Sequence, residues 1–187
     1  MRPASLRNAI VLTSAILLTA LSANAAPTLP TADQVMTQAE ASAAAQHKNI
    51  LLDFGASWCG NCHLFEHFLA DPAIKPIIDH SFVIARLDDG ELPNDTHHAN
   101  SPGAVALRAK LGGAKAGYPF ILMLSPNGHP IVTSLRPDPA TPGGNNVGYP
   151  ALPVEIDWFM HMLQLSAPTL TPQQTATIQS WLKAHAS

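Results

Sequence analysis

Residues 50–63 have the sequence ILLDFGASWCGNCH, and this stretch decides both the fold and the chemistry that we expect. Its first five residues, Ile50 to Phe54, form an apolar run of strand length, which is typical of a strand buried on both faces of a sheet. After a short loop, a helix is expected to begin near Cys59. Two cysteines separated by two residues therefore lie at the start of a helix that follows a buried strand.

The start of a helix is a place where Cys59 becomes reactive. Unpaired backbone N–H groups and the helix dipole give a helix N-terminus a partial positive charge. A thiolate is stabilised there, so the pKa of Cys59 is lowered and its sulfur becomes a nucleophile at neutral pH. We therefore expect Cys59 to be the more exposed, attacking thiol and Cys62 to be the buried thiol that resolves a mixed disulfide. An inert bridge is disfavoured, because so short a loop gains little from a cross-link.

Two more side chains in this stretch are candidates for function. Asp53 is a carboxylate in a dry strand, which raises its pKa, and near a thiol pair it could take the proton of Cys62 as a general base. A hydrogen-bonded structural acid is the alternative for Asp53. Trp58 is expected to shield the sulfurs and to contact partners, with plain core packing as its alternative.

The rest of the chain predicts one α/β domain. Expected helices lie at residues 32–48, 59–70, 73–79, 101–111, 154–164 and 171–181, and expected strands at residues 50–54, 82–87, 120–124 and 131–135. Residues 88–100 are expected to form a polar surface loop and residues 136–153 an irregular loop. Two strand–helix–strand crossovers followed by a hairpin predict a mixed sheet with helices on both faces.

The N-terminus has the three parts of a secretory signal peptide. Two arginines precede an uncharged apolar run over residues 9–23, and Ala23-Asn24-Ala25 is a small-x-small cleavage site. We therefore expect residues 1–25 to be a signal peptide and residues 26–187 to be one domain in an oxidising compartment, either periplasmic or secreted. An uncleaved N-terminal membrane anchor is the alternative.

The composition of the 187 residues excludes several classes of protein. Only 12% of the residues are charged, about half of the usual ~25%, and 47% are hydrophobic, so a disordered charged chain is excluded. The net charge of −3 and the absence of a basic run argue against nucleic-acid binding. Two cysteines are too few for a small fold held together by disulfides.

From about Ile50 to Leu135 the chain resembles the thioredoxin family. The residues up to Cys62 are similar to the strand and active-site segment of that family, with Asp53 where the family places its buried acid. Gly117-Tyr118-Pro119-Phe120 is similar to the family's cis-proline segment. The resemblance implies a thioredoxin-like three-layer sandwich with an extra C-terminal helix, in which Pro119 faces the cysteine pair and holds a substrate chain in extended pairing.

Two residues depart from the pattern of the family. Asn61 stands where the family's reductases usually have proline, which leaves the redox poise open, and Tyr118 is bulkier than the residue usual before the cis-proline. The predicted site comprises Cys59, Cys62 and Asp53 as catalytic residues, and Trp58, Gly60, Asn61, Tyr118 and Pro119 as substrate-binding residues.

Together, these features predict an exported thiol–disulfide oxidoreductase. Its expected partners are proteins with disulfides or thiols and, for a reducing role, a membrane or periplasmic electron donor. The Cys59–Cys62 disulfide is the redox group, and neither a further cofactor nor a metal is expected. The sequence leaves open whether the protein reduces, oxidises or isomerises disulfides.

Three other interpretations are weighed against this one. The pattern Cys59-x-x-Cys62-His63 also fits c-type haem attachment, with His63 as the proximal ligand. Candidates for the second iron ligand are Met123, Met160 and Met162. A thioredoxin-like binding module without turnover would use Tyr118 and the long loops for recognition. His63 and His67 could share a helix face and bind a metal, but solvated surface histidines are the favoured interpretation.

Overall fold

A four-stranded mixed sheet lies at the centre of the computed structural model, which describes residues 29–186. The strands are arranged in the order β2-β1-β3-β4. Their bounds are β1 (Asn49–Gly55), β2 (Phe82–Asp88), β3 (Phe120–Leu124) and β4 (Pro130–Thr133). Strand β1 pairs in parallel with β2 and antiparallel with β3, and β4 is antiparallel to β3. The expected signal peptide at residues 1–25 lies outside the described residues.

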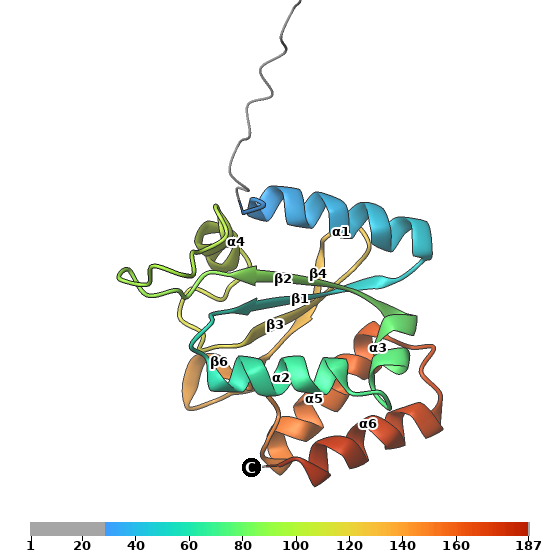
Figure 1. Ribbon diagram of the computed structural model, residues 1–187. Coiled ribbons are helices and arrows are strands. Elements are labelled where there is room, and N and C mark those ends of the chain that lie inside the picture. The colour runs from blue at the N-terminus through green and yellow to red at the C-terminus, as the bar shows by residue number, and fades with distance from the viewer. Residues whose placement is uncertain (1–28, 187) are drawn as a thin grey trace, which may run out of the picture.

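Helices cover both faces of this sheet (Figure 1). One face carries α1 (Ala32–Gln46) and α4 (Ala104–Lys110), and the other carries α2 (Gly60–Ala70), α3 (Lys75–Ser81), α5 (Pro153–Ser166) and α6 (Pro172–Ala184). The predicted three-layer α/β sandwich with an additional C-terminal helix is confirmed. Among residues 29–186, none of the helices combines the length and the apolar character that a membrane crossing requires.

Strand β1 supplies side chains to two separate cores, because successive residues of a strand point to opposite faces. Ile50, Leu52 and Phe54 belong to the core under α1 and α4, whereas Leu51 belongs to the core under α2, α3, α5 and α6. Asp53 has the same parity as Leu51 and therefore points to the face that α2 covers. This places the buried acid beneath the helix that begins with the cysteine pair.

The expected helix over residues 101–111 begins later than predicted. Ser101 and Pro102 were expected to be its cap and first position, but α4 starts at Ala104, after Gly103 in the left-handed region with φ +85°. The backbone N–H of Ser101 donates to the carbonyl of Asp88, and the carbonyl of Pro102 accepts from Ala32 N–H. These long-range contacts hold Ser101 and Pro102 outside the helix.

The prediction of an irregular loop over residues 136–153 is wrong in its first half. Strand β4 ends at Thr133, and the chain then forms a two-stranded antiparallel hairpin of β5 (Leu135–Asp138) and β6 (Thr141–Asn146). Between β4 and β5, the Ser134 hydroxyl accepts a hydrogen bond from the backbone N–H of Ile121 over 3.0 Å, in place of a backbone carbonyl. Proline and glycine are tolerated in β5 and β6 because both strands of this two-stranded sheet are edge strands.

Candidate active site

Cys59 and Cys62 form a disulfide at the N-terminus of α2, with their Cα atoms 5.2 Å apart. Cys59 is the N-cap residue, and its Sγ accepts a hydrogen bond from the backbone N–H of Cys62 over 3.1 Å. Gly60 and Asn61 form the first turn between them and are exposed. The sulfur of Cys59 therefore lies where the N–H groups and dipole of the helix stabilise negative charge.

Both cysteines are buried in this oxidised form. Cys59 is 4% exposed and Cys62 is fully buried, so Cys59 is the more exposed of the two, as expected. The partly buried side chain of Tyr118 packs against this pair together with Ala56. Trp58 is 54% exposed, so the core-packing alternative for Trp58 is wrong and its ring is available to a partner.

Asp53 is a buried acid on the sheet face that α2 covers, and one of its oxygens lacks a hydrogen-bond partner in the described part of the chain. It is 2% exposed, and this oxygen is Oδ1. Burial raises the pKa of Asp53 to about 7, the charge of Arg86 opposes this rise, and the charge of Asp88 adds to it. The alternative of a hydrogen-bonded structural acid is not supported at Oδ1, and a carboxyl that titrates near neutral pH is suited to proton transfer.

Arg86 is a site residue that sequence reasoning missed. It pairs with Asp53 in the register of β1 and β2. A methyl group built at Gly55 would lie 3.2 Å from Arg86 Nη2 and 3.5 Å from Cys62 Sγ, so the guanidinium and the buried sulfur border the same small space. Arg86 also forms ion pairs with Glu66 and with Asp88. The signal in the sequence is a basic residue in a strand otherwise rich in apolar residues.

The loop over residues 88–100 contacts the turn that carries the cysteine pair. Both carboxylate oxygens of Glu91 accept hydrogen bonds from Ser57, one from its backbone N–H and one from its hydroxyl, each over 2.6 Å. The indole N–H of Trp58 donates to the carbonyl of Gly90 over 2.7 Å. The predicted surface loop is therefore a support for the active-site turn, a role that its composition did not indicate.

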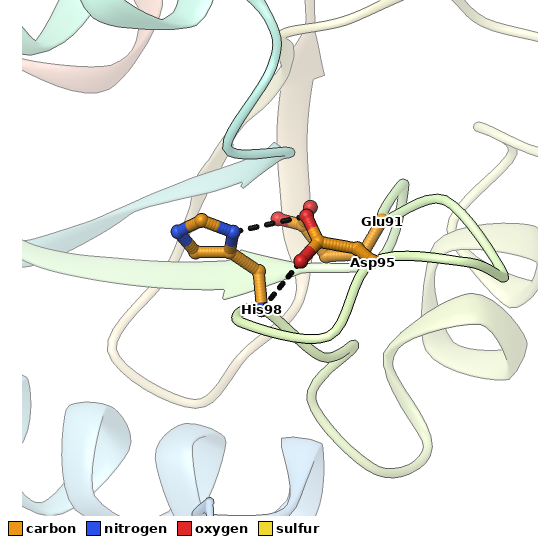
Figure 2. A group of neighbouring side chains, drawn as sticks. All are labelled: Glu91, Asp95 and His98. Carbon is orange, nitrogen blue, oxygen red and sulfur yellow. Dashed lines mark hydrogen bonds and ion pairs between the residues drawn. The ribbon is translucent and has the colours of Figure 1, made fainter.

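In Glu91, Asp95 and His98, the side-chain atoms that could bind a metal ion lie within 4.8 Å of one another (Figure 2). Asp95 accepts hydrogen bonds from the backbone N–H groups of residues 97 and 98 and from the His98 ring. These bonds lower the pKa of Asp95 to about 2, and the bond to Asp95 raises that of His98. The carboxylates thus already have hydrogen-bond donors from the protein, within the loop for Asp95 and in the active-site turn for Glu91.

Both ring nitrogens of His63 face oxygen atoms of the protein. Its Nε2 lies 2.8 Å from the carbonyl of Ser57, and its Nδ1 lies 3.4 Å from Glu66 Oε2. Within residues 29–186, neither His63 nor His67 belongs to a group of three or more potential metal ligands.

The segment with Tyr118 and Pro119 lies beside the cysteine pair, and the peptide bond between these two residues is cis. Asn146 of β6 holds this segment, because its Nδ2 donates to the carbonyls of Gly117 and Pro119 over 3.0 and 2.9 Å. Its Oδ1 in turn accepts from the Ser134 hydroxyl over 2.6 Å. The β5–β6 hairpin, whose role the sequence left open, therefore supports the proline segment.

A groove of about 980 Å³ opens next to this segment. It is bounded by Asn61 at the start of α2, by Tyr118, and by β6 and the residues that follow it. The expected substrate-binding residues Asn61 and Tyr118 thus lie at one end of a surface depression, beside the disulfide. Pro119 is buried.

Comparison with known proteins agrees with this geometry. A family model described as thioredoxin-like matches residues 31–126, just over half of the chain. The chain belongs to the thioredoxin-like family. The family assignment covers the cysteine pair, Asp53 and the proline segment, so the resemblance expected from these residues is confirmed.

Two curated plant relatives of this thioredoxin-like chain are isomerases by name. The chain is 36% identical to a protein disulfide-isomerase of Ricinus communis over 67 residues, which are 35% of this chain and 14% of that protein. It is 32% identical to protein disulfide isomerase-like 1-1 of Arabidopsis thaliana over 87 residues, 46% of this chain and 14% of that protein. The matched segment is thus a small part of each relative.

Solved structures similar to this thioredoxin-like chain are distant in sequence. A disulphide isomerase from Xylella fastidiosa Temecula1 is 18% identical, with a TM-score of 0.48 over 90% of this chain and 100% of that one. The oxidised C-terminal domain of DsbD from Neisseria meningitidis is 17% identical, with a TM-score of 0.42 over 73% of this chain and 99% of that one.

The alternative of c-type haem attachment does not fit the arrangement of the motif. Such attachment needs both cysteine sulfurs in thioether bonds, and here they are bonded to each other. The proximal ligand would be His63, whose Nε2 contacts the carbonyl of Ser57. Of the methionines considered as second ligands, Met123 and Met162 are buried in the core under α2, α3, α5 and α6.

Proposed function

We propose that this chain is an exported thiol–disulfide oxidoreductase that exchanges disulfides with partner proteins. The observation that carries the proposal is the Cys59–Cys62 disulfide at the N-terminus of α2, with the buried acid Asp53 on the sheet face that α2 covers. Thioredoxin-like family membership and the names of the two plant relatives support the same class of reaction. Export is supported by the signal-peptide pattern in the sequence.

The proposed reduction of a partner begins with the dithiol form. The thiolate of Cys59 attacks one sulfur of the partner disulfide, and the other partner sulfur leaves as a thiolate. Cys62 then loses its proton to Asp53 and attacks the Cys59 sulfur, so the second partner thiolate leaves and the Cys59–Cys62 disulfide forms. Two electrons pass from the dithiol to the partner.

The same steps in reverse oxidise a partner dithiol, and the difference between the two reduction potentials sets the direction. A reducing role outside the cytoplasm needs a donor of electrons, which we place in the membrane or the periplasm. Trp58, with its exposed ring, and the groove beside Asn61 and Tyr118 offer the surface on which a partner chain would lie.

The test uses insulin as a disulfide substrate and dithiothreitol as the reductant. Wild-type protein should accelerate insulin reduction, and Cys59→Ser should abolish the acceleration. The exposed Lys110→Met variant serves as a control, because Lys110 lies away from the cysteine pair on α4 and should leave the rate unchanged. Activity retained in Cys59→Ser would overturn the assignment.

A second experiment separates an enzyme from a binding module without turnover. Cys62→Ser leaves the attacking thiol but removes the resolving one, so mixed disulfides with partner proteins should accumulate in the exported fraction of cells. Non-reducing electrophoresis would show these adducts, and they should disappear in Cys59→Ser/Cys62→Ser. Adducts that persist without either cysteine, or partners held without any disulfide, would favour the binding module.

A further inference from the structure

The ring of Tyr118 is held from several sides. The guanidinium carbon of Arg108 lies 4.4 Å from the centre of the ring, and Trp58 meets it edge-on with ring centres 6.0 Å apart. A methyl group built at Gly90 would lie 2.6–2.8 Å from the Tyr118 ring and hydroxyl, so the backbone of the 88–100 loop touches the ring closely. The position of Tyr118 is therefore set by α4, by the loop and by the active-site turn together.

Beneath this ring lies a buried pair of opposite charges. Asp89 is 5% exposed and Arg108 is 8% exposed, and Asp89 Oδ2 lies 3.6 Å from Arg108 Nη1. The same Nη1 donates to the Tyr118 hydroxyl over 3.2 Å, and Nη2 donates to the carbonyl of Ala116. Arg108 thus binds both the side chain of Tyr118 and the backbone that leads into it.

The Asp89–Arg108 pair is poorly explained as a device for stability. Neither carboxylate oxygen of Asp89 has a partner at ordinary hydrogen-bond distance in the described part of the chain, although Tyr118 and Arg108 lie close enough to lower its pKa, and Arg108 Nε is without a partner too. Burial raises the pKa of Asp89, and the charge of Arg108 opposes that rise. Buried ion pairs with unsatisfied atoms are commonly no more stable than apolar residues of similar volume. What the pair does provide is a fixed position for Tyr118.

The position of Tyr118 matters because of what it covers. Its side chain packs on the group formed by Ala56, Cys59 and Cys62, and Cys59 is only 4% exposed. An attacking thiol must approach a disulfide sulfur closely and roughly along the S–S bond, so a ring packed against this group limits the rate of attack.

We infer that Asp89 and Arg108 are positioning residues that hold the Tyr118 ring over the Cys59–Cys62 disulfide and thereby restrict which thiols reach it. Small thiols meet the closed cover, whereas a protein partner that binds Trp58 and the adjoining groove can displace the ring as it docks. The inference rests on the proposed function for its biological meaning, but the restriction itself is a property of the oxidised protein.

The experiment measures the rate at which dithiothreitol reduces the Cys59–Cys62 disulfide in purified, oxidised full-length protein. Dithiothreitol gives up two electrons and becomes a cyclic disulfide, while the protein disulfide becomes two thiols. Samples are quenched with acid and the new thiols are counted by alkylation and mass spectrometry. Arg108→Met removes both hydrogen bonds and the charge over the ring, so the rate constant should rise by about threefold to tenfold as the open population grows.

Comparison with Tyr118→Ala makes the result specific to the cover. This variant removes the ring and should raise the rate at least as much as Arg108→Met, and the double variant should be no faster than Tyr118→Ala alone. Lys110→Met, an exposed change two residues further along α4, should match the wild type. Tyr118→Phe keeps the ring and loses the hydroxyl contacts with Arg108 and Asp89, so it should give a smaller rise and is the variant least able to disturb folding.

The inference is overturned by an unchanged or slower reduction of both Arg108→Met and Tyr118→Phe in protein with native circular dichroism. It is also overturned if Arg108→Met raises the rate by the same factor when Tyr118 is already alanine, since the effect then does not act through the ring. If the wild-type protein fails to reduce insulin while these rates behave as expected, the proposed function is rejected but the inference about Tyr118 is not.

Discussion

Asp53 on β1 lies opposite Arg86 on β2, so an acid whose pKa burial raises to about 7 faces the guanidinium that opposes this rise. Beside Gly55, the Arg86 guanidinium also borders the same small space as Cys62 Sγ. The acid, the cation and the resolving sulfur therefore form one electrostatic unit.

The raised pKa of Asp53 predicts a pH dependence of stability. Between the ordinary carboxyl pKa of 3.8 and about 7, the folded protein holds a proton on Asp53 that the unfolded chain releases. The free energy of unfolding therefore falls as pH rises through this window and levels off above about pH 7. For oxidised protein we expect a loss of about 2–3 kcal/mol between about pH 5 and about pH 8 from this group.

Asp53→Asn should remove that component, which urea unfolding at the two pH values would measure. The exposed acid Asp157 on α5 provides a matched control, and Asp157→Asn should keep the wild-type pH dependence. Equal slopes of stability against pH in wild type and Asp53→Asn would show that Asp53 does not carry the raised pKa.

The contact between Asp53 and Arg86 also predicts how the pKa of Asp53 changes when Arg86 is replaced. Burial and the charge of Asp88 both raise the pKa of Asp53, and Arg86 is the group that lowers it. Arg86→Met should therefore move the titration of Asp53 upward, above about 7. Carboxyl carbon chemical shifts in labelled protein would report the midpoint. Arg136→Met, on the β5–β6 hairpin, should leave it unchanged, and a downward shift in Arg86→Met would contradict the assignment of Arg86.

The proposed proton transfer from Cys62 to Asp53 predicts an effect of Asp53 on the rate of the reaction. If Asp53 accepts that proton, Asp53→Asn should slow resolution of the mixed disulfide by about a hundredfold, because general-base catalysis contributes on this scale. Stopped-flow reduction of insulin near neutral pH, with quenched samples examined for mixed disulfide, would detect both the slower turnover and the trapped adduct. Turnover within about twofold of wild type would leave Asp53 without a part in proton transfer.

The central elements could be predicted because their signals are local. The apolar run at Ile50 to Phe54 is the buried β1, as its length and composition indicate. Cys59 at the start of α2 follows from the same stretch. A chain segment of strand length followed by a helix start needs little information from elsewhere in the molecule.

The rest of the site depends on contacts between residues far apart in the chain. Arg108 and Tyr118 meet only once α4 and the proline segment are in place, so the packing of Tyr118 against the cysteine pair was not predictable. Glu91 reaches Ser57 across the fold. Strand β6 contains Pro142, Gly143 and Gly144, residues that ordinarily indicate a loop, and its pairing with β5 overrides this local preference.

The contact of Glu91 with Ser57 predicts that the loop over residues 88–100 stiffens the active-site turn. Glu91→Ala removes two acceptors at once, so the Ser57 N–H loses its partner and stability should fall by about 1–2 kcal/mol. Hydrogen exchange of the Ser57 amide should become faster. His97→Ala, an exposed change in the same loop, should leave this amide protected as in wild type. Unaltered exchange in Glu91→Ala would show that the turn is held by other contacts.

Asn146 links the β5–β6 hairpin to the proline segment through both polar atoms of its side-chain amide. The Nδ2 donates to the carbonyls of Gly117 and Pro119, and Oδ1 accepts from Ser134. Asn146→Asp keeps the shape but turns a carboxylate oxygen toward two carbonyl oxygens, so we expect a loss of about 2–3 kcal/mol in unfolding free energy above the carboxyl pKa. Chemical unfolding at neutral pH measures this loss, and the loss should shrink in acid as the carboxyl becomes protonated.

Asn127→Asp is the matched control. Asn127 lies in the exposed turn between β3 and β4, so the same amide-to-carboxylate change meets none of these carbonyls and should cost little stability. Equal stability of the two variants at neutral pH would mean that the hairpin does not hold the proline segment through Asn146.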